Sequence, residues 1–190
     1  MVPLSCSTGT PCSNRTLTVS GFYEDGGNFG LTKVGNGTLV LNVVNGYTGG
    51  TTVNGGTLSL LGSGGNGRIG GALTVNAGAT VVTTGDGTGF GFFNQLTALT
   101  INGGLVKAET SSSHIWNITG GISMTGGELQ TNGGTSTADG HAFQWNRTAL
   151  TTNAAANSAV ISGRINLRAD GGYANWAIDV ADGAAATDLL

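Results

Sequence analysis

The sequence predicts an all-β chain folded as a parallel β-solenoid of about seven coils. Three observations predict it: the composition, a turn block that recurs along the chain, and a second feature at a fixed offset from that block. Glycine supplies 36 of the 190 residues, and only 9% are charged. Disordered chains are charged or proline-rich and poor in β-branched residues, whereas this chain is rich in Val, Ile and Thr. Collagen is excluded because glycine does not recur at every third position.

The turn block consists of an apolar residue, a short glycine turn and a second apolar residue. It reads TVNGGTLSL from 52, LTVNAGATVV from 73, LTINGGLVKA from 99 and ISMTGGELQT from 122, with a partial copy, KVGNGTLVL, from 33. A unit of roughly 19–26 residues is too short for a strand–helix–strand crossover. It suits one solenoid coil, stacked about 4.8 Å from the next. The glycines expected at the shared corner are Gly37, Gly56, Gly78, Gly104 and Gly127.

Apolar residues alternate with polar ones on both sides of each turn. A period of two places the apolar side chains on one face of a strand. Stacking the coils would then bury equivalent residues in a single column. The expected column is Val53, Leu58, Val75, Ile101, Val106, Met124 and Leu129.

The second recurring feature is an aromatic residue followed by asparagine. Phe93-Asn94 stands 11 residues before Gly104, and Trp116-Asn117 stands 11 before Gly127. Trp145-Asn146 repeats the pair. A constant offset predicts an aromatic–Asn ladder on successive coils, whereas the competing hairpin sandwich predicts no such constancy.

The N-terminal residues 1–20 are assigned to a cap, a strand or an exchange arm, and residues 21–190 to the solenoid. Cys6 and Cys12 are the only cysteines. Their spacing is compatible with a disulfide loop of an oxidising compartment and equally with two free thiols. No apolar run approaches the roughly 20 residues of a membrane span, so no transmembrane segment is expected. The cations are scattered and the formal net charge is −3, so nucleic acid is not an expected partner.

Residues 31–64, LTKVGNGTLVLNVVNGYTGGTTVNGGTLSLLGSG, resemble the autotransporter-associated β-strand repeat of bacterial passenger domains. The resemblance is carried by the Leu-Thr-Lys opening and by the glycine blocks that follow, and it is looser beyond residue 64. It implies a right-handed parallel β-helix that is exported and displayed on, or shed from, a bacterial surface. At 190 residues the chain is shorter than such proteins usually are, so their secretion route is not carried over.

Residues for catalysis or cofactor binding are sparse. Asp86 and Asp139 could project from similar loops, but glycoside hydrolysis needs two carboxylates facing one substrate, and neither has an acidic neighbour at a matching offset. Glu24 to Asn28 is a weak calcium candidate, equally readable as a turn. Thr-x-Thr rows, used by some ice-binding solenoids, occur at Thr16/Thr18 and Thr135/Thr137 but not at coil spacing. We expect no enzyme activity, no cofactor and no metal site.

The expected function is that of a non-catalytic extracellular structural or adhesive module, secreted or at the cell surface. Its expected partner is itself, through end-to-end association or through continuation of a longer chain. The alternative is a carbohydrate-binding or polysaccharide-processing domain acting on host or matrix glycans. Its sugar-stacking strip would be drawn from Phe90, Phe92, Phe93, Trp116, Phe143, Trp145, Tyr173 and Trp176.

Overall fold

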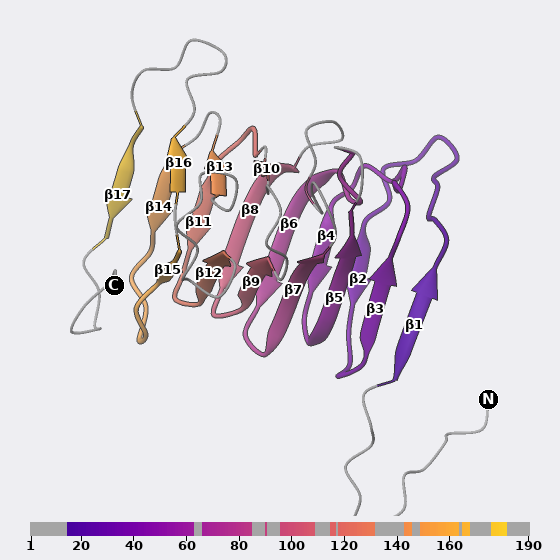
Figure 1. The fold of residues 1–190 in the computed structure, drawn as a ribbon, viewed down its shortest axis with the longest axis horizontal. Helices are drawn as coiled ribbons and strands as arrows, with labels where there is room; N and C mark the ends of the chain where they lie inside the picture. Colours follow the sequence, from indigo (N-terminus) through magenta and orange to yellow (C-terminus); the bar gives the residue numbers. More distant parts are fainter. Residues whose placement is uncertain are drawn as a thin grey trace, which may run out of the picture.

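The structure is a computed structural model that describes residues 15–62, 66–84, 90, 96–108, 115–116, 118–131, 143–145, 149–163, 165–167 and 176–181. All regular elements in these ranges are strands, and they stack into three parallel sheets (Figure 1). The predicted parallel β-solenoid is therefore confirmed. No helix in these ranges is long and apolar enough to cross a membrane.

Two sheets of seven strands run along the whole stack. Sheet A contains, in spatial order, β1 (Thr16–Val19), β3 (Thr38–Leu41), β5 (Gly56–Leu61), β7 (Ala79–Thr84), β9 (Leu105–Ala108), β12 (Glu128–Thr131) and β15 (Val160–Ser162). Sheet B contains β2 (Leu31–Lys33), β4 (Thr51–Val53), β6 (Gly71–Asn76), β8 (Leu96–Asn102), β11 (Ile122–Met124), β14 (Leu150–Thr152) and β17 (Ile178–Val180). Sheet C, confined to the C-terminal half, contains β10 (Ile115–Trp116), β13 (Phe143–Trp145) and β16 (Ile165–Leu167).

Each coil passes along sheet B, turns a sharp corner and continues along sheet A. Every strand pairs with its equivalent one coil away, so all pairings between named strands are parallel. The coil count differs slightly from the expected seven, because in the described residues the first and last strands belong to incomplete turns. Coil length varies more than expected: bonded partners lie 22 residues apart at Asn54 and Asn76 but 28 apart at Thr125 and Asn153.

The core lies between sheets A and B. All seven residues of the expected column are buried, but they form two facing rows rather than one column. Val53, Val75, Ile101 and Met124 are consecutive partners in sheet B. Leu58, Val106 and Leu129 lie in sheet A, where Val81 completes the row. The physical reason is that the corner falls between them, so residues before and after each turn belong to different sheets.

The corner is tight because it touches the preceding coil. A Cβ added at Gly104 would lie 2.7 Å from Val75 Cγ1 and 2.8 Å from the Asn76 carbonyl oxygen. A Cβ at Gly127, where φ is +79°, would lie 2.7 Å from Ile101 Cγ2. Strand register also shows that the five expected corner glycines are not all equivalent.

The exception among them is Gly78. Ala79, one residue later, is the partner of Gly56 in sheet A. The register of the adjacent strands places Gly37, Gly104 and Gly127 in the same row as Gly56. Aligning the copies on the last turn glycine therefore shifts this coil by one residue.

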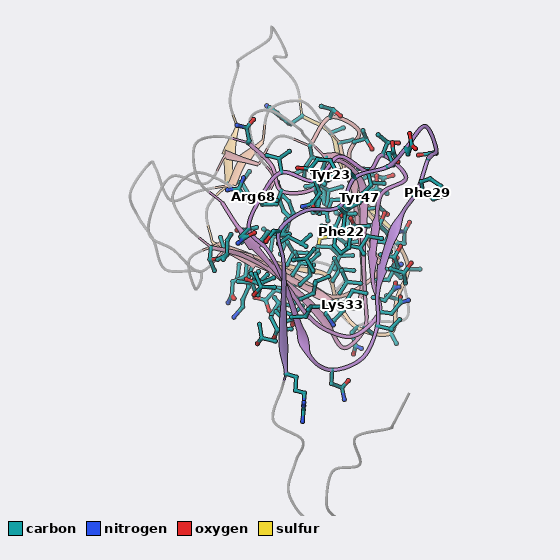
Figure 2. The ribbon with its side chains drawn as sticks, turned by 90° about the vertical axis from the view of Figure 1, so that its right-hand side faces the viewer. Phe22, Tyr23, Phe29, Lys33, Tyr47 and Arg68 are labelled. Atoms are coloured by element: carbon teal, nitrogen blue, oxygen red, sulfur yellow. The ribbon has the colours of Figure 1, made fainter. Side chains whose placement is uncertain are left out.

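The third side of the first coils is closed by side chains that link one coil to the next. Asn45 accepts a hydrogen bond from the Phe22 amide (2.7 Å) and donates to the Arg68 carbonyl (2.8 Å), so it bridges three coils. The Tyr47 ring meets Phe22 edge-on at 6.4 Å, and its hydroxyl bonds Thr51 Oγ1 at 2.7 Å. Figure 2, viewed from the β1 end of the stack, shows Phe22, Tyr47 and Arg68 on the side of the coil away from the corner. This polar and aromatic closure replaces sheet C at the N-terminal end.

Several expectations fall on residues outside the described ranges: Cys6, Cys12, Phe93, Asn94, Asn117 and Asn146. The backbones of Trp116 and Trp145 are direct partners in sheet C. Strand β1 pairs with β3, so the solenoid already includes part of the segment 1–20.

Candidate functional surface

The outer face of sheet B carries a row of hydroxyl side chains, one from each coil. Parallel register aligns them across six strands. They point outward because their neighbours in each strand are buried in the core. The row is Thr32, Thr52, Thr74, Thr100, Ser123 and Thr151.

A second row, of asparagine side chains, follows two residues later at the edge of the corner. Asn76 Nδ2 donates to Asn54 Oδ1 (2.6 Å), and Asn102 Nδ2 donates to Asn76 Oδ1 (3.1 Å). Further along, Asn153 Nδ2 donates to Ser123 Oγ (2.9 Å) and Thr125 Oγ1 (3.1 Å). These bonds join the coil of Asn54 to that of Asn76, the coil of Asn76 to that of Asn102, and, further along, the coil of Ser123 to that of Asn153 on the solvent side of the sheet.

Sequence reasoning missed this ladder, although its signal was present. The sequence predicts a ladder at the aromatic–Asn pairs instead. The signal of the observed ladder is the recurring Thr-x-Asn spacing at 52–54, 74–76, 100–102 and 151–153, which marks the residues but not which of them stand side by side. We call the combined surface the Thr–Asn face, formed by Thr52, Asn54, Thr74, Asn76, Thr100, Asn102, Ser123, Thr125, Thr151 and Asn153.

The Thr–Asn face is free of charge at all ten positions. The first charge along the hydroxyl row is Asp179, the partner of Thr151 in the last coil. Sheet A differs, since its outward positions include Lys107 and Glu128. The two outer faces therefore offer different chemistry to a partner.

A groove of about 450 Å3 follows the corner from Gly78 to Val160. Its lining includes the glycines Gly103, Gly104 and Gly127, and Thr80, Glu128 and Ser158 add polar side chains. The Ser162 hydroxyl bonds Glu128 Oε1. The lining contains a single carboxylate, whereas glycoside hydrolysis needs a pair.

Lys33 occupies the inward row at the first strand of sheet B, where Val53 is its partner. Its ammonium donates to the carbonyl oxygens of Gly35 (2.9 Å) and Gly55 (2.8 Å), on two successive corners. Burial lowers the pKa of Lys33. In Figure 2 the side chain lies inside the coil, near the convergence of the two sheets. Lys33 therefore closes the end of an apolar row and ties two corners together.

The calcium candidate at Glu24 to Asn28 is a loop held by its own carboxylate. Glu24 Oε2 accepts the amides of Phe29 (3.0 Å) and Thr48 (3.1 Å), while Oε1 accepts the Thr48 hydroxyl (2.6 Å). The Thr48 hydroxyl and then the Phe29 amide, which together outweigh desolvation, lower the pKa of Glu24. Both carboxylate oxygens of Glu24 therefore accept hydrogen bonds from Phe29 and Thr48, as expected of a side chain that stabilises a turn.

The other candidate residues do not come together in a described site. Asp86 and Asp139 lie outside the described ranges, and no group of three or more His, Cys, Asp or Glu side chains within those ranges is placed to hold a metal ion. Phe90 is fully buried and Trp176 packs against the core, so neither belongs to an exposed aromatic strip. The exposed aromatic side chains of the described part are Tyr23 and Phe29, in the first coil (Figure 2).

A comparison with known protein families supports the repeat that the sequence analysis found in residues 31–64. A family model described as passenger-associated-transport-repeat matches residues 31–60. This segment contains strands β2 to β4 and most of β5, so the resemblance found in the sequence is confirmed there. No curated protein and no solved structure is significantly similar to the chain. Repeats of this kind belong to autotransporter passenger domains, which are secreted or surface-exposed.

Proposed function

We propose that the protein is a non-catalytic structural module of a secreted or surface-displayed bacterial protein. The observation that carries the proposal is the match over residues 31–60, whose strand register continues through every later coil to β17. A module of this kind acts through its extended, stable shape. The core rows, the Asn ladder and the corner contacts all join neighbouring coils, as expected for a stack in which each repeat supports the next.

Two measurements test this proposal. Antibodies against the chain should label intact, unpermeabilised cells that produce it, or should detect it in the medium. Labelling only after permeabilisation would contradict a surface or secreted location. The purified chain should also release no product from common polysaccharides, and turnover abolished by Glu128→Gln would contradict the non-catalytic assignment.

We further propose that modules associate end to end. The apolar rows continue to the outermost described strands, where Leu17 in β1 is 63% exposed, Ile178 in β17 is 56% exposed and Val180 is 46% exposed. An outer strand with unpaired backbone groups beside apolar side chains favours pairing with another strand. A head-to-tail contact of this kind continues without closing, so it would build a filament.

Sedimentation velocity at micromolar concentration tests the association. The wild-type chain should form species larger than a monomer, and Val180→Lys should return it to a monomer. The matched control is Val44→Lys, at a site that is 38% exposed but outside the end strands, and it should leave association unchanged. A strictly monomeric wild-type chain would contradict end-to-end association without affecting the surface assignment.

The corner groove favours one second candidate function, the binding of a neutral glycan. Its lining includes four glycines and the hydroxyl-bearing residues Thr80 and Ser158. Retention on a polysaccharide matrix, reduced by Thr80→Trp, would support it. Absence of retention would rule out glycan binding in the groove, and the structural role would be the remaining proposal.

A further inference from the structure

The Thr–Asn face is a regular two-dimensional array. Along the solenoid axis, equivalent side chains repeat at the strand spacing of about 4.8 Å. Along each strand, Thr and Asn stand two residues apart, or about 6.7 Å. Four coils carry Thr-x-Asn at these positions and one carries Ser123-x-Thr125. Both repeats are close to the distances between water oxygens on low-index planes of hexagonal ice.

The array is held in place before any partner arrives. The ladder bonds from Asn76 to Asn54 and from Asn102 to Asn76 orient the amides along the axis. Thr side chains are restricted at χ1 because they are β-branched. Their positions are set from below by fully buried neighbours such as Val75 and Ile101. A surface ordered in this way loses little conformational entropy on binding.

The chemistry of the face narrows the choice of partner. Its ten side chains supply hydroxyl, amide and methyl groups but no charge, so a charged partner has no counter-charge there. Sugar rings are commonly bound by aromatic rings, and none stands at these positions. Protein interfaces are enriched in aromatic residues, Met and Arg, none of which is present. A periodic, uncharged and strongly hydrogen-bonding partner remains, and crystalline water has these properties.

We propose that the Thr–Asn face binds ice. The Thr methyl groups would lie against the crystal while the hydroxyls and amides hold a layer of water in register with the lattice. Thr-x-Thr rows do not recur at coil spacing in the sequence. The row that does recur at coil spacing is Thr-x-Asn, and only the strand register places its members side by side.

The test is thermal hysteresis and inhibition of ice recrystallisation, measured on the full chain. The wild-type protein should separate the melting and freezing points and keep ice grains small after annealing. Thr100→Tyr, in the centre of the face, should abolish both effects because the ring holds the face away from a flat crystal. The matched control is Thr57→Tyr on the outer side of sheet A, and it should retain wild-type activity. Circular dichroism should show the same β-sheet signal in both variants.

A second variant guards against misfolding of Thr100→Tyr. Ala72 is exposed on the same face, two residues before Thr74 towards the start of β6, and Ala72→Tyr should also remove the activity. The proposal is overturned if the wild-type chain shows neither effect. It is also overturned if Thr57→Tyr impairs activity as much as the two substitutions on the face. Retention of the wild-type chain on a neutral polysaccharide that is lost in Thr100→Tyr but kept in Thr80→Trp, without any hysteresis, would assign the face to glycan binding instead.

Discussion

Replacing Gly104 with alanine tests the contact between one coil's corner and the core of the coil before it. The new Cβ would meet Val75 Cγ1 at 2.7 Å and the Asn76 carbonyl oxygen at 2.8 Å. Neither can move away easily, since Val75 is fully buried and Asn76 belongs to β6. Overpacking of this kind costs about 1–3 kcal/mol, while the stiffer unfolded chain returns about 0.4–1 kcal/mol. We expect Gly104→Ala to reduce the free energy of unfolding by about 1–2 kcal/mol.

The matched control is Gly55→Ala. Gly55 also lies in a corner and has no positive φ, but its added Cβ would come no closer than 3.6 Å to another atom. This substitution should be neutral or should stabilise the protein by up to about 1 kcal/mol. Urea denaturation followed by circular dichroism measures both. With a slope of about 1–3 kcal/mol/M, the two midpoints should differ by about 1 M.

A double-mutant cycle identifies the contact. Val75→Ala alone removes two buried methyl groups and should cost about 2 kcal/mol. Combined with Gly104→Ala, the cost should be smaller than the sum, because the added methyl enters space that Val75 Cγ1 has left. The reasoning is wrong if Gly104→Ala is as mild as Gly55→Ala, or if the cycle is additive.

Three further predictions concern polar groups. Lys33→Met should destabilise the protein by about 1–3 kcal/mol, because the Gly35 and Gly55 carbonyls lose their donor. Because the pKa of Lys33 is lowered in the folded state, the folded chain binds fewer protons than the unfolded chain at alkaline pH. The free energy of unfolding of the wild-type protein should therefore rise as the pH approaches about 10.4, the ordinary pKa of lysine. Urea titrations of Lys33→Met should show a flatter dependence on pH. The lowered pKa of Glu24 also makes stability rise with pH, here in the acid range. The stabilisation by the Glu24 carboxylate is present above about pH 4.3, the ordinary pKa of glutamate, and is lost as the pH falls through the pKa of the folded state. Glu24→Gln should remove that dependence from thermal melts, and an unchanged acid profile would contradict the loop geometry. Asn76→Ala, which removes two ladder bonds, should shift the urea midpoint more than Asn54→Ala, which removes one; equal shifts would argue that the ladder contributes nothing.

The sequence by itself determined the fold class and the core. Repeated turn blocks at intervals too short for a crossover helix exclude most alternatives, and burial of a side chain follows from alternation within one strand. Val53, Val75 and Ile101 were therefore recognisable as core residues without knowledge of their neighbours. The repeat in residues 31–60 was recognisable for the same reason, since its motif lies within one continuous segment.

Only the tertiary structure decided which residues of different coils stand side by side. Coils differ in length because insertions are absorbed in the loops, so equal sequence offsets do not imply equal positions in the stack. This is why Ala79 rather than Gly78 is the partner of Gly56, and why the expected column divides into two facing rows. It is also why the Asn ladder and the hydroxyl row were found only when the strand register was known: both are properties of pairing between coils. A hydrogen bond between Asn76 and Asn102, 26 residues apart, depends on where the intervening chain returns, and local periodicity does not encode that return.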